Sequence, residues 1–398
     1  MQLQMKVVSF CHYLQGPACT QYLADMGAEV IKIEPLQGAF ERHWSGGNSY
    51  VNGVSAFLMS ANRNTQSLAI DLKQPRAVEI VLRLIDEADV VIENFRPGVL
   101  ERLGLGYDVM CERKPSLIYA SASGLGRTGP AASRPGQDLL MQARSGLISA
   151  TGSGAQGPSA VGAAVVDQHG GALLAMGILG AYVRRLQTGA GTRVESSLFA
   201  AGIDLQTEAL TKFYAVQHSP DVFSRDAHVG SWYHDAPYGV YPLADCHLVL
   251  SMNDPVRLAE ALDSETLRAL QTIDRYAERD RYAQAVAVEL AGRRFADVSA
   301  VFDAHAIWHE RVQSYDELRR DPQAVHNEAF REIDVPGGGK AVLVNHPLRY
   351  DGELPAYRRM PFQPGCDSAE ILTRLGIDDA TLQTLIRDRV VAVPPSGR

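Results

Sequence analysis

Asp167 is the residue of this sequence that is best placed for covalent chemistry. It follows the apolar run Ala163–Val166 and stands where a helix is expected to begin, and Gly170 and Gly171 come one turn later. A carboxylate flanked by backbone N–H groups and small residues can attack an acyl carbon and let backbone approach the developing oxyanion. The same position suits a helix N-cap, because an Asp there accepts hydrogen bonds from first-turn amides. Spacing alone leaves both roles open.

Two glycine-rich segments match the GxGxxG spacing of dinucleotide-binding loops, namely Gly124–Gly129 and Gly152–Gly157. Such a loop must follow a strand, open a helix and precede an acidic residue by about 20 positions. The first segment follows an expected strand but runs into Pro130, and the second runs into Pro158. We therefore predict no nicotinamide cofactor and interpret both segments as flexible loops that let backbone approach a ligand.

The His and Cys residues indicate no metal site. None of the 11 His lies in an HExxH or similar ligand spacing, and those near aromatic residues, such as His247, fit ordinary turn or surface positions. The five Cys are scattered and form no CxxC pair, which argues against both a disulfide framework and a zinc site. Scattered, unpaired thiols are typical of a cytoplasmic protein.

Composition excludes several classes of protein. The chain has 398 residues, of which 46% are hydrophobic and 21% charged, as in ordinary globular proteins. The net charge of −8 and the unclustered Lys and Arg argue against a nucleic-acid groove, although a few cations could still bind an anionic substrate. No signal sequence is evident, and the most apolar later stretch, Gly170–Val183, is too short and glycine-rich for a bilayer. We expect a cytoplasmic protein with no membrane partner.

Strands and helices alternate through the first third of the chain. The expected strands are residues 6–10, 28–34, 67–72, 88–94 and 116–121. The expected helices are residues 18–26, 75–86 and 97–103. Strands separated by helices of about ten residues form βαβ units, which predict an α/β fold with a Rossmann-like, mostly parallel sheet.

The later chain predicts a second lobe. A helix at 168–187, a strand at 193–197 and a helix at 198–213 extend the first lobe. From about residue 216 most of the His and two of the three Trp appear, with a hairpin-like segment and then amphipathic helices. We expect a large Rossmann-like domain at 1–215, an inserted smaller α+β domain at 216–325 and a returning C-terminal segment at 326–398.

Long ordered stretches of this sequence match the pattern of one known family. The stretches are Gly16–Gln21, Leu23–Pro35, Ala88–Gly98, Gly124–Asp138, Ser145–Gly171 and Ala236–Tyr241. Together they resemble the class III (CaiB/BaiF-type) coenzyme A transferases over nearly the whole chain, strongly to about residue 200 and more loosely beyond.

The resemblance implies a homodimer, a nucleophile and a reaction. Members of the family form interlocked homodimers in which each subunit threads through its partner. Their catalytic aspartate lies in a V-x-D-x-x-x-G region, which falls on Asp167 here. That residue would carry coenzyme A from an acyl-CoA to a small carboxylic acid through anhydride and aspartyl-CoA thioester intermediates. Acyl-CoA enters as a co-substrate, and no permanently bound cofactor is expected.

The resemblance also assigns positions near coenzyme A. Asn94 and Phe95, at the end of an expected parallel strand, match residues beside the nucleotide and pantetheine, and the ends of such strands are common ligand sites. Lys73 and Arg102 match cations near the phosphates. These cations would supply the anion binding that the net charge does not suggest.

Gln15 and Ala18 border the loop that lines the thioester in the family. Formyl-CoA transferases carry a Gln one position earlier, where this chain has Leu14. This departure weakens a specific role for Gln15.

Further departures concern the substrate pocket. The small lobe lacks the glycine tetrad of formyl-CoA transferases, which disfavours formyl and oxalyl transfer. The motif Gly-Glu-His-Thr appears as Gly365–Ser368 with the sequence Gly-Cys-Asp-Ser, which is expected to alter local packing. The residues expected near the substrate are Gln137, Asp138, His228, Trp232, His234 and Tyr238.

Two alternative functions stay open at this point. The α-methylacyl-CoA racemases share the fold and use a His/Asp acid–base pair, whose Asp would be Asp167. Their His would fall in the block Gly136–Asp138, where this chain has Gln137, and Gln cannot exchange a proton as His does. A catalytically inactive CoA-binding protein is the other alternative, against which the presence of Asp167 and its neighbouring glycines argues.

Overall fold

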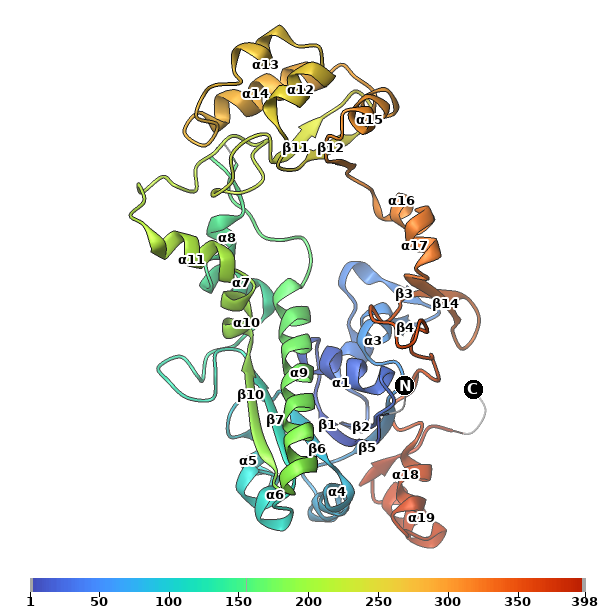
Figure 1. Cartoon of the computed structure of the whole chain (residues 1–398). Helices are drawn as coiled ribbons and strands as arrows, with labels where there is room; N and C mark the ends of the chain where they lie inside the picture. Colours follow the sequence, from blue (N-terminus) through green and yellow to red (C-terminus); the bar gives the residue numbers. More distant parts are fainter. Residues whose placement is uncertain (1–2, 155, 396–398) are drawn as a thin grey trace. The chain divides into compact units, whose positions relative to one another are not determined.

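A seven-stranded sheet is the centre of the fold within residues 3–154 and 156–395, the part of the chain that the computed structural model describes (Figure 1). In spatial order its strands are β10 (Thr192–Ser197), β7 (Ile118–Ser123), β6 (Val90–Glu93), β1 (Lys6–Phe10), β2 (Glu29–Glu34), β5 (Gln66–Ile70) and β16 (Val391–Ala392). Neighbours pair in parallel except β16, which is antiparallel to β5. The predicted α/β class with a mostly parallel sheet is confirmed.

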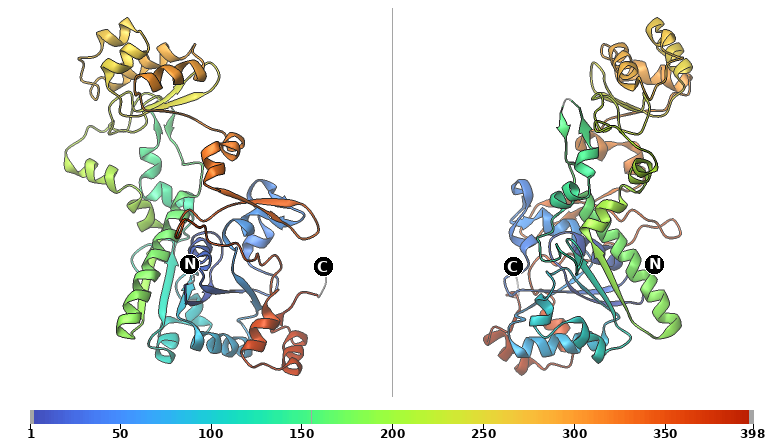
Figure 2. Two further views of the ribbon diagram at one scale, coloured as in Figure 1. Left: turned by 45° about the vertical axis from the view of Figure 1, so that its right-hand side comes forward. Right: turned by 90° about the vertical axis from the view of Figure 1, so that its left-hand side faces the viewer.

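Helices cover both faces of this sheet. Val7 and Val8 are successive residues of β1 and enter two separate hydrophobic cores, because strand side chains alternate between faces. One core packs against α1 (Gln15–Asp25) and α9 (Val165–Thr188). The other packs against α4 (Pro75–Glu87), α6 (Tyr107–Arg113), α18 (Ser368–Arg374) and α19 (Asp379–Arg387). Figure 2 shows α9 lying along one face of the strands.

The strand order reverses at β1. The chain proceeds from β1 to β2 and β5 on one side, and then returns to β6, β7 and β10 on the other. The loops after β1 and β6 therefore leave the carboxyl edge of the sheet in opposite directions. Such a switch point is where open α/β sheets commonly bind ligands.

A hairpin from the C-terminal segment packs beside the loop region that follows β2. Strands β14 (Phe330–Asp334) and β15 (Lys340–Val344) share a small core with α3 (Ala56–Ala61), and Figure 2 shows the hairpin beside that segment. The short elements of the same region are α2 (Phe40–His43), η1 (Gly46–Asn48), β3 (Tyr50–Val51), β4 (Val54–Ser55) and α17 (Pro322–His326). The remaining short helices near the sheet are α5 (Val99–Arg102), α7 (Asp138–Arg144) and α10 (Leu198–Asp204).

A second compact unit has its own core. An antiparallel sheet of β11 (Gly239–Pro242), β12 (His247–Leu250) and β13 (His309–Arg311) packs against helices. These helices are α12 (Pro255–Ala261), α13 (Glu265–Ala269), α14 (Arg279–Leu290) and α15 (Phe295–Ala304). Its peripheral elements are α8 (Leu147–Ala150), β8 (Gly152–Ser153), β9 (Gly157–Pro158), α11 (Thr207–Ala215) and α16 (Tyr315–Arg320).

The two compact units divide the chain at other points than the predicted domains. Residues 142–163 and 203–321 form the smaller unit, and the rest of the described chain forms the larger one. The helix expected at 198–213 is interrupted after Asp204, so that α10 and α11 replace it. Boundaries at 215/216 and 325/326, the insertion of a small domain and the interlocked dimer stay predictions.

Among the helices of the described chain, none combines the length and apolar character needed to span a bilayer.

Candidate active site

The loops that follow β1 and β6 are tied together at the carboxyl edge of the sheet. The side chain of Asn94 accepts a hydrogen bond from the His12 backbone N–H over 3.0 Å and donates one to the His12 carbonyl over 2.6 Å. The Phe95 ring lies against the His12 ring, with centroids 4.9 Å apart. Asn94 and Phe95 therefore stand at the switch point of the sheet, with the Asn94 amide engaged by backbone.

The two predicted phosphate-binding cations follow β5 and β6 at this edge. Lys73 lies in the exposed turn between β5 and α4, where its backbone N–H donates to Asp71. Arg102 is the exposed last residue of α5, which follows β6. Both side chains are accessible to an anion, and the carboxyl ends of parallel strands share one edge of the sheet.

Asp167 is the third residue of α9 and does not cap it. The helix begins at Val165, and its N-cap residue Ala164 makes no side-chain cap hydrogen bond. Asp138, the first residue of α7, instead accepts hydrogen bonds from the backbone N–H groups of Val166 and Asp167, over 2.8 and 3.0 Å. Another element thus satisfies two of the amides that a helix start leaves unmatched. The N-cap interpretation of Asp167 is wrong.

The charge state of Asp167 is unusual for an aspartate. Burial raises the pKa of this carboxyl to about 7, and the negative charge of Asp138 adds to the rise. A shift in this direction is expected where a carboxylate loses solvent and faces a like charge. Near neutral pH the group is ionised in a substantial fraction and is more basic than a solvated aspartate. A basic, partly desolvated carboxylate is suited to attack an acyl carbon.

Gly170 and Gly171 bring α9 against α1. A Cβ on Gly170 would lie 2.8 Å from Gln15 Nε2, and one on Gly171 would lie 2.8 Å from the Gln15 carbonyl and 2.9 Å from the Ala18 Cβ. The glycines therefore permit close helix packing, a role that the sequence did not indicate. Gln15 and Ala18 of α1 are both buried at this contact. The glycines that they touch lie one turn beyond Asp167 on α9.

The glycine-rich segment Gly124–Gly129 is a loop packed on a second glycine. A Cβ on Gly124 would lie 2.5 Å from the Cα of Gly136, so the two backbones touch. After this segment no helix starts in the described chain before Asp138. The segment therefore lacks the helix start of a dinucleotide-binding loop.

The predicted pocket residues of the smaller unit form two groups. Trp232 is buried among aromatic rings, and Tyr238 stacks on His234 with centroids 4.1 Å apart. His228 Nδ1 instead donates to the Val240 carbonyl, and its ring stacks on Tyr241, which makes it part of the hairpin packing. In the larger unit, Gln137 is exposed beside the buried Asp138. Their contribution to a substrate pocket stays a prediction.

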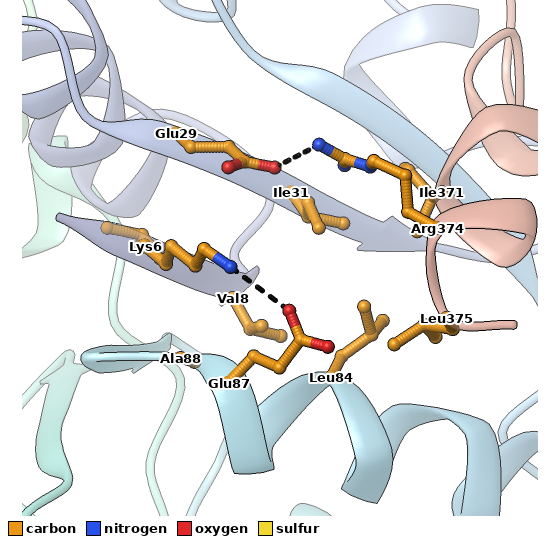
Figure 3. Close-up of a pocket in the computed structure, with 11 residues that line it drawn as sticks. Lys6, Val8, Glu29, Ile31, Leu84, Glu87, Ala88, Ile371, Arg374 and Leu375 are labelled. Carbon is orange, nitrogen blue, oxygen red and sulfur yellow. Dashed lines mark hydrogen bonds and ion pairs between the residues drawn. The ribbon is translucent and has the colours of Figure 1, made fainter. Parts of the chain in front are cut away.

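A cavity of about 70 Å³ lies at the opposite, amino edge of the sheet (Figure 3). Its floor is apolar, with Val8, Ile31 and Leu84, and two ion pairs line it. These pairs join Lys6 to Glu87 over 3.0 Å and Glu29 to Arg374 over 2.6 Å. None of the residues predicted to act in catalysis or CoA binding lines this cavity.

The departure Gly365–Ser368 has a packing role. Asp367 accepts a hydrogen bond from the Ser67 backbone N–H over 2.8 Å and pairs with Arg359, and Ser368 Oγ accepts from the Ala69 N–H over 3.2 Å. The motif thus fastens the C-terminal segment to β5. This arrangement agrees with the expectation of an effect on local packing.

No cluster of three or more His, Cys, Asp or Glu side chains within residues 3–154 and 156–395 is arranged to hold a metal ion.

Sequence reasoning missed the contacts that hold the site in place. Asp138 was expected near the substrate, and its hydrogen bonds to α9 had no sequence signal because 29 positions separate it from Asp167. The link between His12 and Asn94 joins residues 82 positions apart. The polar character of His12 and Asn94 at or just after expected strand ends could have drawn attention to that pair.

Comparison with known proteins gives a consistent result. Residues 3–368 match the family model CoA-transferase family III. An acyl-CoA transferase from Fusarium pseudograminearum (strain CS3096) is 30% identical over 97% of this chain and 87% of its own length. A succinyl-CoA:glutarate CoA-transferase from Mus musculus is 29% identical over 97% of this chain and 89% of its own length. The crystal structure of a CaiB/BaiF family protein from Brucella suis superimposes with a TM-score of 0.80 at 28% identity, covering 93% of this chain and 98% of that one.

Proposed function

The chain belongs to CoA-transferase family III, and we propose that it moves coenzyme A from an acyl-CoA to a free carboxylic acid through covalent intermediates on Asp167. One observation carries the assignment of the nucleophile. Asp138 satisfies the first-turn amides of α9, so the carboxylate of Asp167, whose pKa is raised to about 7, is not consumed as a helix cap. A desolvated carboxylate beside a fixed helix start is suited to nucleophilic catalysis.

The proposed reaction proceeds in four balanced acyl transfers. The Asp167 carboxylate attacks the thioester carbon, and the carbon–sulfur bond breaks to give a mixed anhydride and the CoA thiolate. The thiolate attacks the carboxyl carbon of Asp167, which releases the donor acid and leaves an aspartyl-CoA thioester. The acceptor carboxylate then attacks this thioester, forming a second anhydride and thiolate. Attack of the thiolate on the acceptor carbon gives the new acyl-CoA and restores Asp167.

Coenzyme A is proposed to bind at the carboxyl edge of the sheet. Asn94 and Phe95 shape the crevice at the switch point, and Lys73 and Arg102 are exposed cations for the phosphates. Gln15 and Ala18 line the thioester end, because they pack against α9 one turn from Asp167. Local cations of this kind allow an anionic ligand in a protein whose net charge is −8.

The name of the Mus musculus relative supplies the first substrates to test, succinyl-CoA and glutarate. His228, Trp232, His234 and Tyr238 are proposed to tune the choice of acid, together with Gln137 and Asp138. A cytoplasmic homodimer is proposed as the active form. Its support is the apolar surface of α9, where Met176, Val183 and Leu186 are exposed.

Trapping of the thioester tests the proposal. Intact-mass spectrometry of the protein incubated with succinyl-CoA is expected to detect a CoA adduct, which peptide mapping assigns to Asp167. Heating should break the chain at that residue, since the aspartyl thioester is activated. Asp167→Ala should abolish the adduct and transfer while CoA binding persists.

Asp108→Ala is the matched control, because Asp108 is also an aspartate in the first turn of a helix of the larger unit. This variant should form the adduct as the wild type does. Transfer near the wild-type rate in Asp167→Ala would contradict the proposal, and CoA binding without any adduct would favour an inactive binding protein. Exchange of the α-proton of a 2-methylacyl-CoA with solvent deuterium, without transfer, would favour racemisation.

A further inference from the structure

The glycine-rich loop after β7 carries an arginine whose guanidinium group lies among carboxylates. Arg127 Nη1 donates to Glu93 Oε1 over 2.8 Å, and Nη2 donates to Glu101 Oε1 over 2.6 Å. A third carboxylate, that of Glu195 on β10, lies 3.8 Å from Nε. The Arg127 side chain is 12% exposed. The guanidinium group is therefore held by acids of the protein and is poorly placed to bind a phosphate directly.

Glu93 connects Arg127 to the turn that follows β6. Its carboxylate accepts hydrogen bonds from the Phe95 backbone N–H over 2.9 Å and from the Ser121 hydroxyl over 2.6 Å. The residue is 2% exposed, and a charged carboxylate at that depth is costly without a counter-charge. Arg127 supplies this counter-charge, so the hydrogen bond that orients Phe95 depends on it.

Glu101 lies near the other end of the same segment, in α5. Arg127 thus bridges the residue immediately before Asn94 and the residue immediately before Arg102. One guanidinium group with a rigid fork of donors holds both ends of segment 93–102. This segment carries Asn94, Phe95 and Arg102, three of the residues proposed to contact coenzyme A.

The glycines of the loop explain how Arg127 reaches that position. Gly126 has a φ of 99°, which side-chain-bearing residues rarely adopt, and its N–H donates to Ser123 Oγ over 3.0 Å. The chain therefore turns back over the end of β6 immediately before Arg127. This gives the glycine-rich segment a function that does not involve a dinucleotide.

We propose that Arg127 is a positioning residue for the coenzyme A site. Its guanidinium group holds segment 93–102 in place and neutralises Glu93 and Glu101 beside the expected phosphates. The inference rests on the CoA site of the proposed function. Loss of Arg127 would release the segment, remove the counter-charge of the buried Glu93 and leave the exposed carboxylate of Glu101 to repel an anionic ligand. Salt screens such repulsion, whereas a purely structural role would give a loss that does not respond to salt in this way.

Calorimetric binding of free coenzyme A tests the inference without requiring catalysis. In Arg127→Gln the Kd for coenzyme A is expected to rise about 10- to 100-fold at low ionic strength, with part of the loss recovered in about 0.5 M salt. Arg127→Lys keeps the positive charge but loses the two Nη donors that reach Glu93 and Glu101 together. Its Kd should therefore lie between those of the wild type and Arg127→Gln. Arg113→Gln removes an arginine that pairs with Asp86 on the surface, and should bind as the wild type does.

The double variant Arg127→Gln/Glu101→Gln sharpens the electrostatic part. It also removes the exposed carboxylate of Glu101, so its Kd should be lower than that of Arg127→Gln alone. An unchanged Kd in Arg127→Gln, or a loss that salt and the second substitution leave unaltered, overturns the inference. If Arg127→Gln does not fold, Arg127→Lys decides, since a wild-type Kd in that protein also overturns it.

The outcomes separate this inference from the proposed function. A wild-type protein that binds coenzyme A without forming an adduct on Asp167 contradicts the covalent mechanism and leaves the role of Arg127 supported by the binding data. A normal adduct together with a wild-type Kd in Arg127→Gln contradicts the inference alone. A wild-type protein that binds no coenzyme A contradicts both.

Discussion

Two charge pairs at opposite edges of the central sheet differ in burial. At the carboxyl edge Glu34 ends β2 and pairs with Arg42 over 2.6 Å, and the two side chains are 0% and 4% exposed. At the amino edge Lys6 begins β1 and pairs with Glu87, and both side chains are more than half exposed. A buried pair is costly to desolvate and must be fully hydrogen-bonded, whereas a solvated pair contributes little. We interpret the buried pairs as holding strand ends in one position.

The cavity and the proposed CoA site lie at opposite edges of the sheet. The hollow in Figure 3 has an apolar floor and solvated ion pairs. At the other edge of the sheet, Glu93 ends β6 and Asn94 follows it. The hollow therefore does not coincide with the proposed site. Strand ends that meet at a switch point, buried polar groups with all partners in place, and a carboxyl with a raised pKa are better guides to that site.

The largest effect is expected from Asp167→Asn. Loss of the nucleophile should lower kcat/KM at least about 1,000-fold, because an amide cannot form the anhydride. In the wild type, kcat/KM should fall tenfold per pH unit below about pH 7, where Asp167 becomes protonated. A steady-state pH profile checks this, and full activity at pH 5 would contradict the assigned carboxylate.

The same substitution should increase stability at neutral pH. The pKa of Asp167 is raised in the folded state from 3.8 to about 7, so the folded protein binds more protons than the unfolded chain between these values. Stability of the wild type therefore falls as the pH rises from about 4 to 7, relative to Asp167→Asn. The advantage of the variant should reach at most about 4 kcal/mol above pH 7 and vanish below pH 4. Thermal unfolding at several pH values measures it.

The next effect is expected from Asp138, whose carboxylate holds the start of α9. Asp138→Asn keeps an oxygen that can accept both N–H groups but removes the charge, so the pKa of Asp167 and the acid limb of the pH profile should move to lower pH. Asp138→Ala removes the acceptor and should cost about 1–2 kcal/mol of stability. An acid limb that stays in place in Asp138→Asn would contradict the coupling of the two carboxyls.

A smaller effect on the reaction is expected from Asn94→Ala, because Asn94 bonds to the loop after β1 rather than to the helix that carries the proposed nucleophile. The variant loses both hydrogen bonds to the His12 backbone, so the free energy of unfolding should fall by about 1–3 kcal/mol and the KM for acyl-CoA should rise. Asn345→Ala is a matched control, because that amide also donates to a carbonyl, that of Glu328, and accepts from Arg331. It should lose stability with an unchanged KM. Equal kinetics in the two variants would contradict a special role of the carboxyl edge.

Local patterns were sufficient to predict the sheet and its helices. The strand expected at 6–10 is found at Lys6–Phe10, and the helix expected at 75–86 is found at Pro75–Glu87. In this helix buried residues recur with the spacing of one helical face, and proline marks its start. The interruption within 198–213 was missed because apolar residues continue through it, whereas the compact units change there.

The sequence pointed to Asp167 as the proposed nucleophile, but not to the contacts that hold its surroundings in place. Asp167 was identified by its surroundings and by the family resemblance, and both act over short stretches of sequence. The partners of Glu93 and Asp138 come from 34 and 29 positions away, and a single sequence holds no record of such pairings. Long-range hydrogen bonds arise from the packing of the elements. The N-cap interpretation of Asp167 failed for this reason, because Asp138 from another helix takes the first-turn amides.

The smallest effects are expected at the amino edge. Glu87→Gln and Arg374→Gln each remove one exposed ion pair beside the cavity, and surface pairs of this kind contribute about 0–1 kcal/mol. The free energy of unfolding should therefore change by less than about 1 kcal/mol, and kcat and the KM for acyl-CoA should stay at wild-type values. Chemical denaturation and steady-state kinetics measure both quantities. A raised KM for acyl-CoA in either variant would show that the ion pairs beside the cavity affect coenzyme A binding. The contrast between the two edges would then fail, because charge pairs at the amino edge would also affect the ligand.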